Sequence, residues 1–320
     1  MKALDLFRKY GVVAILILLI IIFTATNPVF LTVTNIINLA KQVAVMAILA
    51  VGMTFVLLTG GIELSMGSVV SLVCVVVSMF VVNNNMPAPL AMLCGIVIAA
   101  FIGFINGLII AKIKVPPLIM TLGMQIFLSG FTYTICGGLP VYGVPDSLKW
   151  LGQTYIATYL PVSALIMIIA LVFGIFILAK TYTGRYFYAI GSNEETANLS
   201  GINVDKIRVL AYTLCGVLVG IAGIVMLGRI GSGQPGAGDS AEMDVLTACV
   251  LGGVSLNGGK GKVGKAFVGV LIIGVLSNGM SLIGMGSFAQ RMVKGFVLIV
   301  AVIIDCLQYV KVRKKVKVIA

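Results

Sequence analysis

The sequence predicts an all-α, polytopic integral membrane protein with about ten transmembrane helices and both termini in the cytoplasm. Three observations lead to this prediction: the composition, the length of the apolar blocks and the placement of the basic residues. Of the 320 residues, 60% are hydrophobic and only 10% are charged, whereas soluble globular domains carry about 25% charged residues. A bilayer crossing takes about 20 mostly apolar residues. The chain therefore has room for one membrane domain, residues 1–320, and for no second, soluble domain.

The apolar blocks follow one another along the chain. The predicted helices cover about 11–27, 41–59, 65–82, 88–111, 116–136, 161–180, 207–229, 243–256, 264–284 and 290–310. The first block follows three basic residues, as in a signal peptide, but no good cleavage site follows it, so we interpret it as a retained helix. Residues 28–40 are expected to form an amphipathic connector. The block 243–256 is the shortest and is preceded by polar residues.

The basic residues indicate which side of the membrane each loop faces. With the N-terminus inside, the cytoplasmic segments 1–10, 60–64, 112–115, 180–208, 257–265 and 311–320 hold 17 of the 22 Lys and Arg residues. The positive-inside rule predicts such an excess. We therefore attribute the net charge of +12 to membrane topology. Nucleic-acid binding would instead require the basic residues to gather on one soluble face.

Glycines punctuate several of the predicted helices. Gly103 and Gly107 form a small-x-x-x-small pair on one helix, and Gly216 and Gly220 form another. Such pairs let two helix backbones approach closely in a membrane, so the sequence predicts a tightly packed bundle. A short internal similarity also appears, because Leu58–Ser65 resembles Val250–Asn257 when Gly60 and Gly61 are laid on Gly252 and Gly253. Internal repeats are frequent in transporters, so these four glycines are candidate structural or gating residues.

Cysteine and histidine usage limits the chemistry. No two of the six cysteines form a CxxC pair, and five lie inside apolar blocks, so we interpret them as small buried hydrophobic residues. Because the chain has no histidine, we expect neither a metal site nor a triad built on histidine.

The segment 181–206 is the longest polar run between two predicted helices. Ser192 and Glu195 fit a capping box, which predicts a short helix over 193–200 with Gly201 as its stop. A helix at this place, joined to two membrane spans, would serve as a lever for a second protein. The alternative is a helix that merely lies at the membrane interface.

The same segment carries a family resemblance. Glu195-Thr196-Ala197-x-x-x-Gly201 resembles the Glu-Ala-Ala-x-x-x-Gly loop of the permease subunits of bacterial ABC importers, with Thr196 in place of the first alanine. The stretches Gly184–Glu194, Gly60–Ser68 and Val250–Gly264 are similar to the ribose-type, carbohydrate-uptake permeases of that class. Together these matches reach from about residue 40 to residue 305.

The resemblance implies a permease subunit in the bacterial inner membrane that forms the pathway for a small neutral polar solute, such as the monosaccharide ribose. An ATP-binding cassette ATPase, which would hold ATP and magnesium, would dock on this chain, and an extracytoplasmic binding protein would deliver the solute. A second copy or a paralogue would complete the pathway. The residues implied in ATPase coupling are Ser192, Asn193, Glu194, Glu195, Ala197 and Gly201.

One motif bears on whether the chain could hydrolyse ATP itself. Gly259–Ala266 nearly matches the phosphate-binding loop G-x-x-x-x-G-K-[ST], but Ala266 lacks the hydroxyl that would bind magnesium, and no strand precedes the motif. We interpret this stretch as a basic turn. The chain is therefore expected to be a transporter subunit without an ATPase site or cofactor of its own.

Glu63 supports an alternative function. A carboxylate near the membrane can bind a proton or sodium, which would make the chain a secondary transporter. It can instead accept hydrogen bonds at the start of the following helix, near Ser65. We favour this structural role because the only other acid that could pair with Glu63 is Asp305. The family that the chain resembles usually has aspartate at this position.

Candidate residues for the solute path are uncharged polar groups within the predicted helices. Each would be costly facing lipid and should face the bundle or the pore, although hydrogen bonding between helices is the alternative for every one of them. They are Asn106, Thr121, Gln125, Ser129 and Asn278. Glu242 and Asp244 are expected at the outer mouth, either in a solvated loop or facing the delivery protein.

Overall fold

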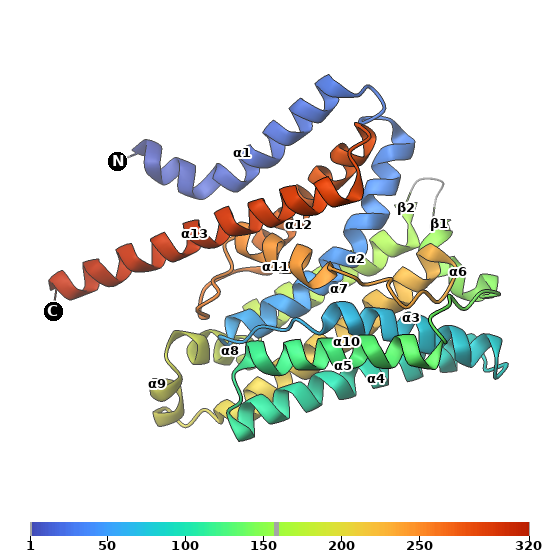
Figure 1. Cartoon of the computed structure of the whole chain (residues 1–320). Helices are drawn as coiled ribbons and strands as arrows, with labels where there is room; N and C mark the ends of the chain where they lie inside the picture. Colours follow the sequence, from blue (N-terminus) through green and yellow to red (C-terminus); the bar gives the residue numbers. More distant parts are fainter. Residues whose placement is uncertain (1, 157–159, 320) are drawn as a thin grey trace.

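The computed structural model describes residues 2–156 and 160–319, and the side chains of 11–156, 160–303, 305 and 306. It is a bundle of long helices, several of which run side by side (Figure 1). The elements are α1 (Lys2–Thr26), α2 (Val33–Leu58), α3 (Met66–Val82), α4 (Ala88–Leu108), the π-helical turn η1 (Ile109–Ile113), α5 (Pro117–Ile135), α6 (Asp146–Gln153), β1 (Tyr155–Ile156), β2 (Leu160–Pro161), α7 (Val162–Lys180), α8 (Tyr182–Ser192), α9 (Glu194–Leu199), α10 (Val204–Ile230), α11 (Ala241–Leu251), α12 (Val263–Leu282) and α13 (Ser287–Ile319).

The predicted class, an all-α polytopic membrane protein, is confirmed. Six helices within the described residues are long and apolar enough to cross a membrane, namely α2, α4 with η1, α5, α7, α10 and α12. Two shorter apolar helices, Gly11–Thr26 and α3, add to these. The described strands are the antiparallel two-residue pair β1 and β2. The N-terminal end of α1 and the C-terminal end of α13 lie at the end of the bundle that carries α8 and α9 (Figure 1).

The centre of the bundle is built from α2 and α10. Every residue of α2 from Val43 to Leu58 is buried, and α10 packs against α4, α2 and α3. A Cβ atom added to Gly103 of α4 would lie 2.4 Å from the Tyr212 carbonyl oxygen of α10, and one added to Gly216 of α10 would lie 2.4 Å from the Ala99 carbonyl oxygen of α4. The close helix packing predicted from the glycine pairs is therefore confirmed.

Four predicted boundaries are wrong by more than four residues. The first helix begins at Lys2 and not near residue 11, and the last continues to Ile319 and not only to about residue 310. Most of the expected connector 28–40 belongs to α2, which begins at Val33, where the Thr32 side chain accepts a hydrogen bond from the Asn35 amide (3.4 Å). The predicted helix 243–256 is α11, whose 11 residues end at Leu251. At about 1.5 Å per residue this helix is too short to cross a hydrocarbon core of about 30 Å by itself.

The residues before α11 form a non-helical segment, 231–240, that packs along α3. A Cβ atom on Gly233 would lie 2.6 Å from the Ser78 hydroxyl, and one on Gly238 would lie 2.1 Å from the Gly67 carbonyl oxygen. The Gly238 amide also donates to the Ser71 hydroxyl (2.9 Å). Non-helical backbone at this position is stabilised because α3 covers it and satisfies its polar groups.

The two segments with similar sequences end their helices in the same way. Gly60 after α2 and Gly253 after α11 both have φ of +79°, and the residue after each glycine donates to a carbonyl five residues earlier. These are Schellman ends, which favour glycine because its missing Cβ permits the left-handed conformation. The structural partner of Gly60 is thus Gly253 and not Gly252, so the sequence alignment was wrong by one residue.

Candidate functional site

The segment 181–206 contains two helices, α8 and α9, rather than the single short helix predicted. Asn193 caps α9, because its backbone is extended and its side chain accepts a hydrogen bond from the Thr196 amide (2.9 Å). Ser192 is the last residue of α8 and donates to the Tyr188 carbonyl (2.7 Å). The predicted capping box at Ser192 and Glu195 is therefore wrong by one residue. Gly201 ends α9 with φ of +82°, as predicted.

One side of α9 is buried and the other is free. Ala197 is 4% exposed and packs in a small hydrophobic cluster with Ile190 of α8 and Val204 of α10. Leu199, in contrast, is 83% exposed, and Glu195 is also exposed. A helix fixed on one side and open on the other has the form of a docking element.

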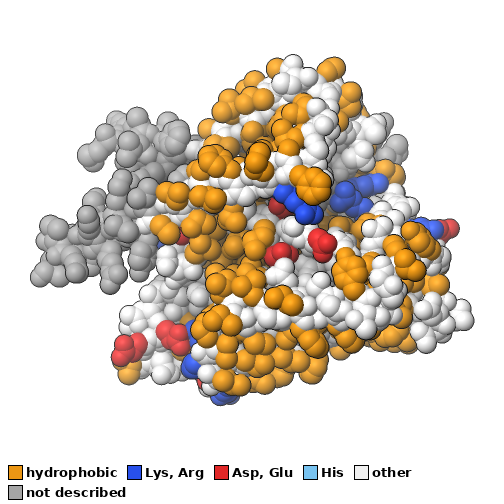
Figure 2. Space-filling view, in the orientation of Figure 1, with side chains coloured by type: hydrophobic (Ala, Val, Ile, Leu, Met, Phe, Trp, Pro, Cys, Tyr) orange, Lys and Arg blue, Asp and Glu red, His pale blue; other side chains and the backbone are white. Residues whose placement is uncertain are grey.

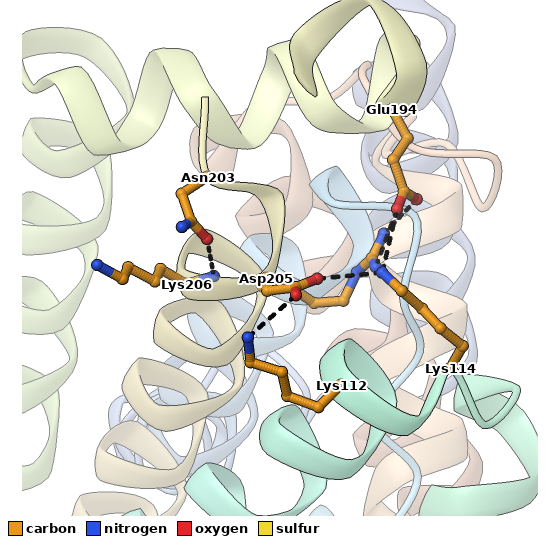
Figure 3. Close-up of polar contacts among 7 residues, drawn as sticks. Lys112, Lys114, Glu194, Asn203, Asp205 and Lys206 are labelled. Atoms are coloured by element: carbon orange, nitrogen blue, oxygen red, sulfur yellow. Dashed lines mark hydrogen bonds and ion pairs between the residues drawn. The ribbon is translucent and has the colours of Figure 1, made fainter. Parts of the chain in front are cut away.

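An ion-pair network joins α9 to the neighbouring helices (Figure 3). Arg208 of α10 donates to Glu194 of α9 (2.6 Å). Lys114, just after η1, lies 3.0 Å from Asp205 and 3.7 Å from Glu194, and Lys112 lies 3.3 Å from Asp205. The Arg208 hydrogen bond, together with the positive charges of Arg208 and Lys114, lowers the pKa of Glu194. The network therefore links α9, η1 and α10 through ion pairs.

The geometry of Lys114 is unusual. Its φ of +62° is left-handed, which is uncommon for a residue with a side chain, and it directly follows the π-helical turn η1. Beside it lies an open hollow of about 610 Å³ lined by Lys114, Glu194, Glu195, Asn198, Asn203, Val204 and Asp205. Three elements thus surround a polar surface depression next to α9.

A second connection joins α8 to two other segments through glycines. A Cβ atom on Gly191 would lie 1.9 Å from the Leu58 carbonyl oxygen and 2.4 Å from the Gly259 nitrogen. The Gly259 amide donates to the same Leu58 carbonyl (3.0 Å), and the Tyr188 hydroxyl donates to the Gly261 carbonyl (2.8 Å). The end of α8, the end of α2 and the loop 252–262 therefore meet backbone to backbone. We call this contact the glycine junction.

Glu63 is held by hydrogen bonds within the protein. It is 4% exposed, and it accepts from the amide (2.8 Å) and hydroxyl (2.5 Å) of Ser65 and from the Asn106 side chain (2.9 Å). The Asn106 Oδ1 atom has no hydrogen-bond partner among the described residues. Asp305 lies elsewhere and accepts from the Leu256 amide (3.4 Å). The geometry thus has Glu63 holding the start of α3, next to Gly60 and Gly61.

The five candidate path residues do not converge on one site. Thr121 is buried and donates to the Pro117 carbonyl of its own helix (2.9 Å). Asn278 exchanges two hydrogen bonds of 2.9 Å with Asn35 and so joins α12 to α2. Ser129 is half-buried on α5, one turn after Gln125. Thr121 also donates to the Ile62 carbonyl (3.4 Å), next to Glu63, to which Asn106 donates. The structure therefore places Thr121 and Asn106 near Glu63, Gln125 and Ser129 one turn apart on α5, and Asn278 apart from both groups.

A polar cluster lies where α5, α11 and α13 meet. Gln125 of α5 donates to Glu242 of α11 (2.9 Å), and Lys294 of α13 pairs with Asp244 of α11 (2.6 Å). Figure 2 shows acidic and basic side chains near the middle of a face that is otherwise largely hydrophobic. The expectation that Glu242 and Asp244 lie in a solvated outer loop or face the delivery protein is wrong. Segment 231–240 folds back along α3 and carries both residues into the bundle.

Comparison with known proteins gives consistent matches. Residues 35–302 match the protein family described as branched-chain amino acid transport system / permease component. The chain is 40% identical to the ribose import permease protein of Escherichia coli (strain K12) over 303 residues, 94% of each chain. It is 42% identical to the ribose import permease protein of Bacillus subtilis (strain 168) over 93% of this chain and 92% of that one.

A relative named for another sugar also matches along the whole chain. The galactose/methyl galactoside import permease protein of Haemophilus influenzae is 34% identical over 97% of each chain. No solved structure matches.

Proposed function

This chain belongs to the ribose-type family of ABC transporter permeases, and from that premise we propose that it forms the translocation pathway through which a bacterial importer takes up a monosaccharide such as ribose. It is a multi-pass protein of the bacterial inner membrane. The observation that carries the proposal is the identity of about 40% to ribose import permeases, which covers more than nine tenths of this chain and of those relatives.

The proposed topology has ten crossings and two cytoplasmic termini. In it, α11 and the segment 231–240 before it together make one crossing, because the helix is too short by itself. This assignment puts α8, α9 and the basic residues near them in the cytoplasm, and β1, β2 and α6 outside. The two termini lie at the same end of the bundle as α8 and α9, which supports this assignment (Figure 1).

The ATPase that would drive transport is proposed to contact this chain at α9. An ATP-binding cassette ATPase would dock on the exposed side of α9 and in the hollow beside Lys114, where Leu199 and Glu195 are free to contact it. ATP and magnesium belong to that ATPase, and this chain supplies no nucleotide site. An extracytoplasmic binding protein would deliver the sugar, and a second copy of this chain or a paralogue would complete the path.

Transport would proceed by alternating access. Because ATP and sugar can drive a cycle only if they favour different conformations, ATP binding must move α9 relative to the rest of the bundle. The ion-pair network and the glycine junction are the contacts through which that movement would spread.

Coupling to a proton or sodium gradient is the alternative. It needs a carboxylate that can exchange its ion with water along the path. The buried position of Glu63 and its three hydrogen bonds favour a structural role instead.

Reconstitution tests the proposal against this alternative. The chain is placed in proteoliposomes with its ATPase and its binding protein, and uptake of radiolabelled ribose is measured. We expect uptake to require ATP on the side of the membrane that carries the ATPase. It should persist when an uncoupler and a sodium ionophore are added. Uptake driven by an ion gradient without ATP would overturn the proposal.

A further inference from the structure

The half-length helix α11 carries polar contacts to two other helices, α5 and α13. It packs mainly against α12 and α2 and also contacts α13. Among the side chains that the structure describes, one polar contact joins it to each: Gln125 of α5 donates to Glu242 (2.9 Å), and Lys294 of α13 pairs with Asp244 (2.6 Å). Both contacts are in the first turn of α11, at the end that follows segment 231–240.

These contacts join α11 to parts of α5 and α13 whose neighbouring side chains are largely exposed. The residues of α13 that flank Lys294 are strongly exposed, with Met292 at 73% and Phe296 at 66%. On α5, the neighbours of Gln125 are similar, with Ile126 at 73% and Phe127 at 65%. The two polar ties therefore lie on a largely exposed part of this face, beside the apolar contacts that α13 makes with the core through Val297 and Ala301.

The opposite end of α11 is attached to the cytoplasmic elements. After Gly253 the chain forms the compact loop 252–262, in which the Ser255 amide donates to the Lys260 carbonyl (2.9 Å). This loop sits on α8 at the glycine junction, through Gly191 and through the hydrogen bond from Tyr188. A displacement of α8 and α9 therefore reaches α11 without passing through a flexible segment.

The backbone of α11 packs directly against that of α12. A Cβ atom on Gly269 of α12 would lie 1.9 Å from the Ala248 carbonyl oxygen, so the two helix backbones touch. Segment 231–240, which precedes α11, is non-helical and contains several glycines. One end of α11 thus follows a non-helical segment that is held along α3, and the other end is joined to the glycine junction.

We propose that α11 is the gate of the solute path: Glu242 and Asp244 are positioning residues that hold it closed against Gln125 of α5 and Lys294 of α13, and the glycine junction transmits the movement of α9 that releases them. This inference rests on the proposed function and adds a specific element and four residues to it. In the closed state the two ties join α5, α11 and α13. In the open state they separate, and their polar groups become available to the hydroxyl groups of a passing sugar.

The experiment measures solute leak and coupling in the reconstituted complex. Lys294→Met removes the charge and keeps the length of the side chain, and it should raise ribose influx without ATP by about tenfold, since breaking a partly buried ion pair shifts an equilibrium by at least that factor. The same variant should use more ATP per ribose imported. A charge swap, Asp244→Lys with Lys294→Asp, should restore a low leak.

Two further variants make the test decisive. Arg291→Met changes an exposed residue one turn earlier on the same helix and should leave leak and coupling unchanged. Glu242→Gln weakens the other tie with little change of shape and should also leak, and it replaces Lys294→Met if that variant does not assemble. Normal leak and coupling in the tie variants, or a charge swap as leaky as the single variants, would overturn the proposal. The leak needs no ATP, so it remains interpretable even if the wild-type complex fails to import ribose, which would contradict the proposed function alone.

Discussion

Gly191 at the glycine junction has no room for a side chain, so its substitution by alanine should destabilise the protein. A Cβ atom there would lie 1.9 Å from the Leu58 carbonyl oxygen and 2.4 Å from the Gly259 nitrogen, and both are backbone atoms that cannot rotate away. Because non-bonded contacts of this kind are favourable only beyond about 3.5 Å, α8 must move away from α2 by more than about 1 Å in the variant Gly191→Ala.

The cost follows from two terms. Overpacking of this kind costs about 1–3 kcal/mol, and loss of the hydrogen bond from Gly259 to Leu58 adds about 1 kcal/mol. We therefore expect Gly191→Ala to lower the free energy of unfolding by about 2–4 kcal/mol, which lowers Tm by several degrees in a chain of this size. Because the junction joins α8 to α11, the variant should also use more ATP per ribose imported.

Gly264→Ala is the matched control. It lies in the first turn of α12 at the same end of the bundle, and a Cβ atom there would meet nothing within 4 Å. Thermal unfolding of the purified complexes and the ratio of ATP hydrolysed to ribose imported are measured for both variants. If Gly191→Ala unfolds at the same temperature as Gly264→Ala and keeps the wild-type ratio, the reasoning about the junction is refuted.

Three further predictions concern charged residues. Lys114→Met should reduce ribose uptake more than ATP hydrolysis, because the Lys114 ammonium links α9 to α10. The control is Lys206→Met, which should match wild type in both assays. It removes an exposed charge that has no salt bridge in the described part of the chain. Glu63→Gln should retain ATP-driven uptake, since an amide oxygen can still accept at the start of α3; uptake lost in this variant would support ion coupling. Arg208 lowers the pKa of Glu194 below its usual 4.5, so the stabilisation from this pair is present above pH 4.5 and is lost as the pH falls through the lowered pKa. The difference in Tm between wild type and Glu194→Gln should accordingly stay constant from neutral pH to about pH 5, and a loss beginning near pH 6 would contradict that sign.

The features predicted from sequence depend on local chemistry. Gly201 ends α9 because a helix followed by a left-handed residue favours glycine, and the paired glycines of α4 and α10 indicated close packing because only a missing Cβ allows it. The cap of α9 was harder to place, since Ser192 and Asn193 are both good capping residues. Packing decided it: Phe187 and Ile190 are almost fully buried, which keeps α8 helical through Ser192.

Long-range partners could not be predicted in the same way. Glu242 and Asp244 follow a glycine-rich polar run, which locally indicates a solvated loop. Only the return of segment 231–240 along α3 brings them to Gln125 and Lys294, and no local pattern encodes that return. The signal that could have revealed it is the short length of the following helix, because an element too short to cross a membrane needs a non-helical partner segment at the same depth.

The central claim is that the ATPase contacts this chain at α9 and moves it when ATP binds. Cross-linking from that helix tests this claim most directly. Leu199 is suited to carry a photo-reactive side chain because it is 83% exposed, whereas Ala197 is buried. In the reconstituted complex we predict that a probe at position 199 captures the ATPase and that the yield changes when ATP binds. A probe at Tyr142, exposed at the opposite end of the bundle, should not capture it. Capture of the ATPase from position 142 and not from position 199 would contradict the account.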